Sequence, residues 1–214
     1  MSTSYMERVY ARLKRSIIAH DVKPGDIINE RGLAEALHVS RTPVRKAIQR
    51  LETEGWVAVQ PWKGVVVLPV TPDEVDEVLQ LRLLLEPMIL DMIITRLDQQ
   101  DITRLEDLLT RQSKLRGPEQ GEEFIRIDHE FHITLAEMSG GKRLLQFMSQ
   151  LRDIQLRLGV TAVQRRDRFA ETLAEHEEII CHLRRRDCLG AKHAMVNHLL
   201  RTRKALSLQV FPNE

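Results

Sequence analysis

The chain has 214 residues, of which 43% are hydrophobic, 29% charged and 4% aromatic, and this composition indicates a mostly helical globular protein. No apolar run is long enough to cross a membrane and the N-terminus lacks the regions of a signal peptide, so we expect a cytoplasmic protein with no membrane association. The net charge of +1 conceals an asymmetry, because residues 1–70 hold 11 Lys and Arg against 7 Asp and Glu, a surplus that favours a polyanionic partner for this part.

The first 70 residues contain three predicted helices and one predicted β-hairpin. Apolar periodicity places the helices at about 5–19, 30–37 and 41–53. β-branched residues at 56–60 and 65–69 flank a turn with Pro61 and Gly64, which predicts the single pair of strands in the chain. Thr71 and Pro72, followed by two acidic residues, have the pattern of a helix N-cap and first turn. We therefore place a domain boundary near residues 69–71 and expect domains 1–70 and 71–214.

The rest of the chain contains six predicted helices, at about 72–97, 101–115, 118–138, 142–160, 167–186 and 188–208. Glycine, proline and charged turns mark the breaks between them. The predicted fold is mainly α: an N-terminal winged helix-turn-helix and a C-terminal antiparallel all-helical bundle. The glycine-rich motifs that bind nucleotide phosphates do not occur in the sequence. The two cysteines, Cys181 and Cys188, are expected to be buried thiols of a reducing compartment.

The segment from residue 33 to 48 has the pattern of a helix, a tight turn and a second helix. Ser40 is the expected N-cap of the second helix, with its hydroxyl accepting a bond from a free backbone N–H. Arginine and threonine at the start of a helix suit base recognition in the major groove, and basic residues beside it can hold the phosphate backbone. The expected DNA contacts are Arg31, Ser40, Arg41, Thr42, Arg45, Lys46, Lys63 and Gly64. The alternative is that these are solvated charges on a helix surface.

The two tryptophans lie in this same part of the chain. Trp56 is expected in the core at the foot of the hairpin, whereas Trp62 can be either exposed at the tip or packed.

Four residues in the C-terminal part have the geometry of metal ligands. Asp128 and His132 are four residues apart on one predicted helix and so share a face. His176 and His198 would be about 33 Å apart on one straight helix. Asp187 lies midway and is a plausible N-cap, so a reversal there would bring both histidines to the same height and close them on Asp128 and His132.

This donor set suits a divalent transition metal, with zinc expected first and nickel, manganese or iron as alternatives. Any one histidine, taken alone, is more often an ordinary core or surface residue. The i,i+4 pair and the symmetric placement about a break favour a shared ion for the whole set. The remaining histidines that we considered lack such geometry and are expected not to be ligands: His20, His38, His129, His182 and His193.

The N-terminal part resembles the GntR family of regulators over essentially its whole length. The matching segments are Val22-Lys-Pro-Gly-Asp26, Glu30-Arg-Gly-Leu-Ala34, Val39-Ser-Arg-Thr-Pro-Val-Arg-Lys-Ala47, Leu51-Glu-Thr-Glu-Gly-Trp-Val57 and Lys63-Gly-Val65. The resemblance implies operator contacts at Arg31, Arg41, Thr42, Arg45 and Gly64.

The C-terminal part, from about residue 71 to 206, resembles the FCD effector domain of the FadR-like GntR subfamily. The matching segments are Leu81-Arg-Leu-Leu-Leu-Glu86, Asp128-His-Glu-Phe-His132, Glu175-His-Glu-Glu-Ile179 and Asp187-Cys-Leu-Gly-Ala191, together with Met195 and His198. The resemblance implies a metal inside the bundle that a small carboxylate effector reaches. Ser139-Gly-Gly141 departs from the Asn that commonly follows Ser-Gly in that subfamily, which leaves any contact made by that Asn open.

Arg82 is the best candidate for a second contact with the effector carboxylate. A solvated role or an interhelical ion pair is an equally good interpretation of this residue.

The leading hypothesis is a ligand-responsive transcription regulator, not an enzyme, that binds a palindromic double-stranded operator as a twofold homodimer. Effector binding would alter operator affinity through different affinities for two arrangements of the protein. One alternative is a metal-dependent hydrolase or isomerase with an accessory DNA-binding domain, for which the sequence offers no convincing acid or base beside the metal. Another keeps DNA binding and makes the metal purely structural.

Overall fold

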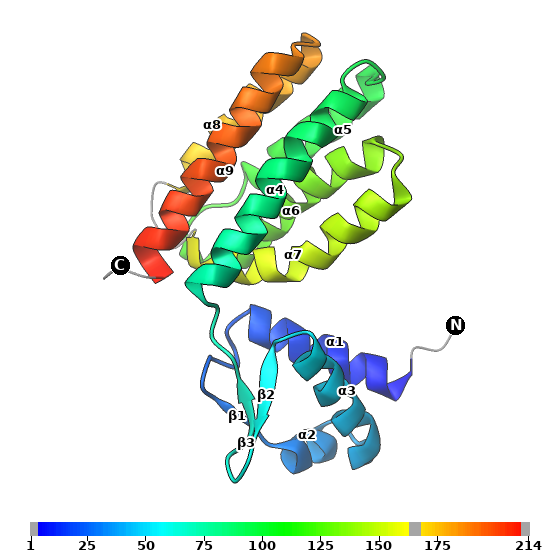
Figure 1. Cartoon of the computed structure of the whole chain (residues 1–214), viewed down its shortest axis with the longest axis vertical. Coiled ribbons are helices and arrows are strands. Elements are labelled where there is room, and N and C mark those ends of the chain that lie inside the picture. Colours follow the sequence, from blue (N-terminus) through cyan, green and yellow to red (C-terminus); the bar gives the residue numbers. More distant parts are fainter. Residues whose placement is uncertain (1–3, 163–167, 211–214) are drawn as a thin grey trace. The chain divides into compact units, whose positions relative to one another are not determined.

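The computed structural model describes residues 4–162 and 168–210 and divides the chain into two compact units, residues 1–70 and 71–214 (Figure 1). Within these described ranges, no helix has both the length and the apolar composition that a membrane span requires.

The N-terminal unit combines three helices with a small antiparallel sheet. The helices are α1 (Tyr5–Ile18), α2 (Glu30–Ala36) and α3 (Arg41–Thr53), and the strands are β1 (Ile27–Ile28), β2 (Val57–Gln60) and β3 (Gly64–Val67). The predicted hairpin is present as β2 and β3, but the expectation of only one pair of strands was wrong. β1 pairs with the free edge of β3, with Ile28 opposite Val65, and the strand order is β1-β3-β2. Two residues are too few to show the alternation that identifies a strand in a sequence.

The core of this unit forms between α1, α3 and the hairpin. The inward face of α3 buries Val44, Ala47, Ile48 and Leu51, the stripe that its helical spacing predicts. Trp56 is buried at the foot of the hairpin, as expected. At the end of α3, Glu54 accepts hydrogen bonds from the Tyr10 hydroxyl and the Lys14 ammonium, both at 2.7 Å, and so ties α3 to α1.

The C-terminal unit contains the six predicted helices. They are α4 (Pro72–Ile93), α5 (Gln99–Gln112), α6 (Gly121–Met138), α7 (Lys142–Ala162), α8 (Arg168–Arg184) and α9 (Cys188–Val210), with a short 3-10 turn at Pro118–Gln120. α4 ends four residues before its predicted end. α5 begins two residues before its predicted start, where the side chains of Asp98 and Asp101 form a capping box. The predicted first residue of α8, Asp167, lies outside the described residues.

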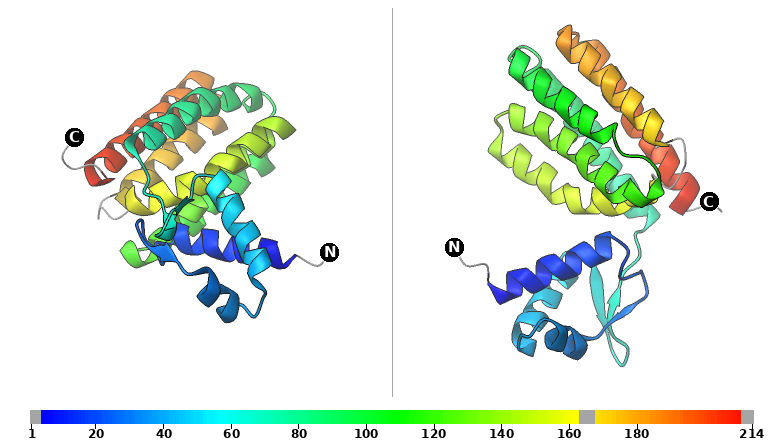
Figure 2. Two further views of the ribbon diagram at one scale, coloured as in Figure 1. Left: turned by 60° about the horizontal axis from the view of Figure 1, so that its bottom comes forward. Right: turned by 180° about the vertical axis from the view of Figure 1, so that it is seen from behind.

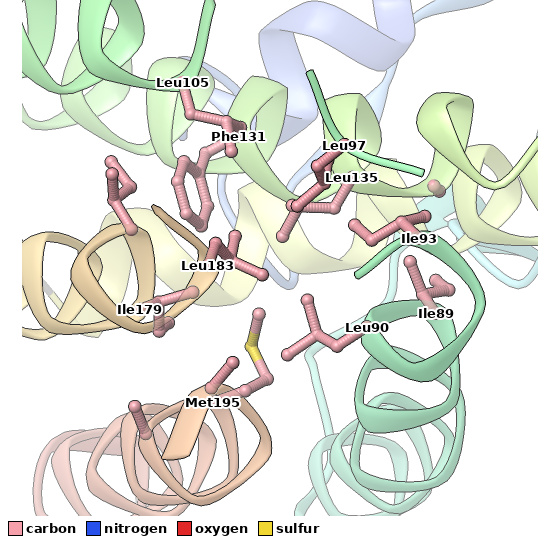
Figure 3. Close-up of a cluster of buried hydrophobic side chains, with 14 of the residues drawn as sticks. Ile89, Leu90, Ile93, Leu97, Leu105, Phe131, Leu135, Ile179, Leu183 and Met195 are labelled. Carbon is pink, nitrogen blue, oxygen red and sulfur yellow. The ribbon is translucent and has the colours of Figure 1, made fainter. Parts of the chain in front are cut away.

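These helices pack as a bundle around one apolar core (Figure 2). α6 packs against α4, α5 and α7, while α8 and α9 form a hairpin in which α9 also contacts α4. The central side chains, several of them drawn in Figure 3, come from every helix of the unit: Leu90, Ile93, Leu105, Phe131, Leu135, Met148, Ile179, Leu183 and Met195. This packing fixes the height of each helix and therefore the height of the polar residues that it carries inward.

Candidate metal centre and nucleic-acid interface

α6 brings two of the predicted ligands into the bundle. Asp128 and His132 lie one turn apart on the face of α6 that turns toward α8 and α9. The His132 side chain is fully buried, and the Asp128 side chain is 16% exposed. The nearest oxygen of Asp128 is 3.9 Å from His132 Nε2.

The other two predicted ligands meet because the chain reverses between α8 and α9. Asp187 lies at this reversal, where its carboxylate accepts a hydrogen bond of 3.0 Å from the Gly190 N–H in the first turn of α9. His176 on α8 and His198 on α9 are both buried, and their ring centroids lie 4.8 Å apart. His176 Nε2 is 3.4 Å from Asp128 Oδ1, so the hairpin closes on α6 as the spacing predicts.

The four predicted residues form one cluster. Each offers a ligand atom, and these atoms all lie within 4.8 Å of one another. The Nε2 atoms of His132, His176 and His198 are buried and have no hydrogen-bond partner within the described part of the chain. Burial and the neighbouring histidines lower the pKa of His176 well below its ordinary value, and burial lowers the pKa of His198. Unprotonated imidazoles and a carboxylate are the donors that a divalent transition metal requires, so the residues fit such an ion.

The second nitrogen of each ring faces an oxygen. His198 Nδ1 is 2.8 Å from Glu175 Oε2, and His176 Nδ1 is 3.2 Å from Gln112 Oε1. The amide of Gln112 donates to the Phe124 carbonyl, which leaves its oxygen for the histidine. An oxygen acceptor at Nδ1 places the ring proton there and leaves the Nε2 lone pair directed into the cluster.

Glu86 on α4 completes this set, with Oε2 at 2.6 Å from His132 Nδ1, although the two atoms are not aligned as a hydrogen bond. Burial opposes ionisation of Glu86, but Arg82 and His132 outweigh it and hold the pKa of this carboxyl well below its usual range.

Glu86, Glu175 and Gln112 were not among the site residues predicted from the sequence. Two of them had a detectable signal: Glu86 forms an i,i+4 charge pair with Arg82 on a strongly apolar helix, and Glu175 directly precedes His176. Gln112 had none, because its role depends on packing between α5 and α8.

Arg82 has neither of the two alternative roles that its sequence allowed, a solvated side chain or an ion pair between helices. It is buried rather than solvated, and its Nε donates to Glu86 Oε1 at 2.6 Å within the same helix rather than between helices. Burying a guanidinium requires such a paired carboxylate. Its Nη2 atom is buried without a hydrogen-bond partner among the described residues.

The cysteines are only half-buried, which corrects the expectation of fully buried thiols. Cys188 donates to a carboxylate oxygen of Asp91 at 3.0 Å, so its thiol links α9 to α4.

In the N-terminal unit, all eight residues predicted to contact DNA are exposed. Arg31, Arg41 and Gly64 line one surface depression of about 460 Å³, together with residues 27–30 and Val65. The beginnings of α2 and α3 and the start of β3 therefore share one surface. Ser40 is the N-cap of α3 as predicted, but its side chain makes no capping hydrogen bond, which corrects the expected contact.

Two of the arginines on this surface form ion pairs within the protein. Arg31 Nε lies 2.9 Å from Glu35, and Arg45 Nε lies 3.1 Å from Glu30. Exposed pairs of this kind contribute about 0–1 kcal/mol, so either guanidinium can be transferred to a phosphate or a base at little cost.

The tip of the hairpin projects a tryptophan. Trp62 is fully exposed, which decides between the two sequence alternatives, and its φ of 68° is in the left-handed region. Gly64 follows with a φ of 95°, a conformation that favours glycine, and the Lys63 N–H bonds the Gln60 carbonyl across the turn.

Comparison with known proteins gives matches for both units. Residues 5–67 match the family described as bacterial regulatory proteins, gntR family, and residues 77–201 match the FCD domain. The chain is 28% identical over 197 residues to the uncharacterized HTH-type transcriptional regulator YdhC of Bacillus subtilis (strain 168), covering 92% of this chain and 88% of that protein. It is 31% identical over 191 residues to an uncharacterized HTH-type transcriptional regulator in an unstable DNA locus of Streptomyces ambofaciens, covering 89% and 80%.

A solved structure of E. coli McbR/YncC has the same fold, with a TM-score of 0.77 at 24% identity, over 98% of this chain and 100% of that one. The helix-turn-helix with its hairpin and the helical bundle thus correspond to the two matched families in order along the chain. The chain belongs to the GntR family of bacterial transcription regulators, with a GntR DNA-binding domain followed by an FCD domain.

Proposed function

We propose that this regulator binds a divalent transition metal in its helical unit through Asp128, His132, His176 and His198. The observation that carries the proposal is the convergence of three buried, unbonded Nε2 atoms on one carboxylate. Leaving three such atoms without a partner costs about 1–3 kcal/mol each, a penalty that a bound cation removes.

We further propose that a small carboxylate is the effector. When bound, a metal with protein donors on one side supplies open positions to an anionic ligand. Arg82 is the residue of this unit proposed to bind a second carboxylate oxygen, because its Nη2 is a buried donor with no acceptor among the described residues. Binding of the acid would change operator affinity by the ratio of its affinities for the two forms of the protein.

The DNA contacts proposed for the N-terminal unit are the eight exposed residues of α2, α3 and the hairpin. Arg41, Thr42 and Arg45 lie in the first turns of α3, where a helix in the major groove presents side chains to base edges. Arg31, Lys63 and Gly64 lie where phosphates on either side can be held.

A twofold homodimer is proposed to bind a palindromic operator, and α4 offers a surface for it. Three large apolar side chains on α4 are exposed at a spacing of four residues: Leu84 (72%), Met88 (42%) and Met92 (36%). α9 begins beside them, since Asp91 contacts Cys188 and Lys192, and its Leu189 is 79% exposed. Such a stripe on one face is typical of an interface between subunits.

The test combines metal analysis with a DNA-binding assay. Purified protein is expected to contain about one metal per chain and to bind an inverted repeat upstream of its own gene. With the metal in place, a screen of small carboxylates by thermal shift is expected to find an acid that changes operator affinity. If chelation lowers only the melting temperature and no acid alters DNA binding, the metal is structural; if no metal binds, the centre itself is refuted.

A further inference from the structure

Two of the proposed metal ligands are held by the same arrangement, although they lie on different helices. In each case the ring Nδ1 faces a buried glutamate, and that glutamate is held by a buried arginine. The third histidine, His176, faces the neutral amide of Gln112 instead.

The first arrangement lies between α4 and α6. Arg82 Nε donates to Glu86 Oε1 at 2.6 Å, and Glu86 Oε2 lies 2.6 Å from His132 Nδ1. The arginine and glutamate side chains are 6% and 3% exposed, and that of His132 is not exposed at all. One carboxylate oxygen therefore accepts the hydrogen bond from the arginine, and the other lies in close contact with the histidine ring without the alignment of a hydrogen bond.

The second arrangement lies between α8 and α9. Arg168 binds both oxygens of Glu175, at 2.8 and 2.9 Å, and also donates to the Thr202 hydroxyl. Glu175 Oε2 in turn accepts from His198 Nδ1 at 2.8 Å. Burial opposes ionisation of Glu175, but the hydrogen bonds with His198 and Arg168 lower its pKa to about 2.

We propose that Glu86 and Glu175 are positioning residues of the metal centre, each fixing one histidine so that Nε2 faces the ion, and that Arg82 and Arg168 hold these carboxylates in place. The inference rests on the metal site proposed above. It also gives Arg82 a task that does not depend on the effector.

The physical reason is orientation. A histidine ring has free rotation about two bonds, and an acceptor at Nδ1 fixes both the rotation and the position of the ring proton. A carboxylate does this only if it cannot turn away, and a buried arginine supplies that restraint. Because Glu86 is on α4 and His132 on α6, the arrangement also fixes α4, the helix that follows directly on the N-terminal unit, against the metal-binding helix.

The experiment measures metal affinity in full-length variants that replace each carboxylate by an amide, Glu86→Gln and Glu175→Gln. A single change removes the buried carboxylate partner of a buried arginine and is expected to destabilise the fold, so each is also made in charge-balanced form, Arg82→Met/Glu86→Gln and Arg168→Met/Glu175→Gln. Glu171→Gln is the matched control on α8, because Glu171 contacts the same Arg168 at 3.4 Å but is exposed and lies outside the histidine contacts given above. Asp76→Asn is the matched control on α4, because Asp76 forms an exposed ion pair with Arg203.

The affinities for Co²⁺ and Zn²⁺ are measured by competition with a chromophoric chelator at fixed pH, together with the visible spectrum of bound Co²⁺ and the melting of the metal-free protein. Both glutamate variants, single and charge-balanced, are expected to lose about 10–100-fold in metal affinity and to change the Co²⁺ spectrum, while the two controls bind as the parent does. Charge-balanced variants that are folded and bind Co²⁺ with parental affinity and spectrum would overturn the inference. If the parent chain itself binds neither metal, the proposed metal site is what has failed.

Discussion

His176 and His198 are 22 residues apart in the sequence, yet their ring centroids lie 4.8 Å apart in the bundle. The reversal that joins them is built at Asp187, midway between the two, which caps α9 through the Gly190 N–H and also contacts the ring of His182 at 2.8 Å. A Cβ at Gly190 would collide with the ring of His182 and the carboxylate of Asp187, so a larger residue here would force these two side chains to move. A small local motif thus sets the geometry of the candidate metal centre.

The first prediction concerns these two histidines. Replacing either by alanine, His176→Ala or His198→Ala, removes one of four donors and is expected to abolish most of the stabilisation that added Zn²⁺ gives. For the parent, metal at 100 times the dissociation constant adds about 2.7 kcal/mol to the free energy of unfolding. The measurement is thermal unfolding with Zn²⁺ and with chelator. His193→Ala, an exposed position on α9, is the control and should keep the full difference.

A second prediction addresses the DNA surface. Arg41→Ala and Arg45→Ala are each expected to weaken operator binding by about 1–3 kcal/mol, because a bidentate contact to a base or a charge contact to phosphate is lost. Fluorescence anisotropy with a labelled inverted repeat measures this at two salt concentrations. Arg104→Ala removes an arginine of the helical unit that pairs with Glu137 and should leave the affinity unchanged. Equal losses in all three variants would argue against the assignment of α3.

A third prediction concerns the exposed apolar stripe of α4. In the proposed dimer, Leu84→Glu combined with Met88→Glu places two charges in the interface between the subunits, and the double variant is expected to be a monomer. Light scattering after size exclusion measures the mass. Thr110→Glu introduces a charge at an exposed position of α5 and is the control. A dimer that persists in the double variant would exclude this face as the interface.

The fourth prediction is a pH dependence in the N-terminal unit. Burial raises the pKa of Glu54, but hydrogen bonds from Lys14 and Tyr10 outweigh burial and leave the pKa below its ordinary 4.5. A lowered folded-state pKa gives stability that is fully present above pH 4.5 and is lost as the pH falls through the folded value. Glu54 is exposed, and solvent screens its interactions. Glu54→Gln should therefore cost up to about 1 kcal/mol at pH 7, and the difference from the parent should shrink below pH 4.5.

Urea unfolding followed by tryptophan fluorescence measures this difference, because both tryptophans, Trp56 and Trp62, lie in the N-terminal unit and report on it alone. The exposed Glu52 accepts a bond from the Val59 N–H and offers Glu52→Gln as a matched control. A difference between parent and Glu54→Gln that stays constant down to pH 3 would show that the charge of Glu54 contributes nothing.

The sequence alone determined the helices, their order and the four residues of the candidate metal centre. These features depend on local rules: apolar spacing defines a helix, a capping residue marks its start, and side chains four residues apart share a face. Asp128 and His132 follow from the last rule directly. His176 and His198 follow from a break placed symmetrically between them at Asp187, so no tertiary contact had to be known.

Only the tertiary structure decided which groups contact the Nδ1 atoms of the histidines and where Arg82 lies. Glu86 meets His132 from another helix, and Gln112 meets His176 across 64 residues of chain. Such contacts depend on the relative height and rotation of packed helices, which the shapes of many core side chains set together. β1 was missed for a related reason, because two residues become a strand only through the edge of β3 that they meet. The spacing of residues within one segment does not identify a contact residue of another segment, because only packing brings the two segments together.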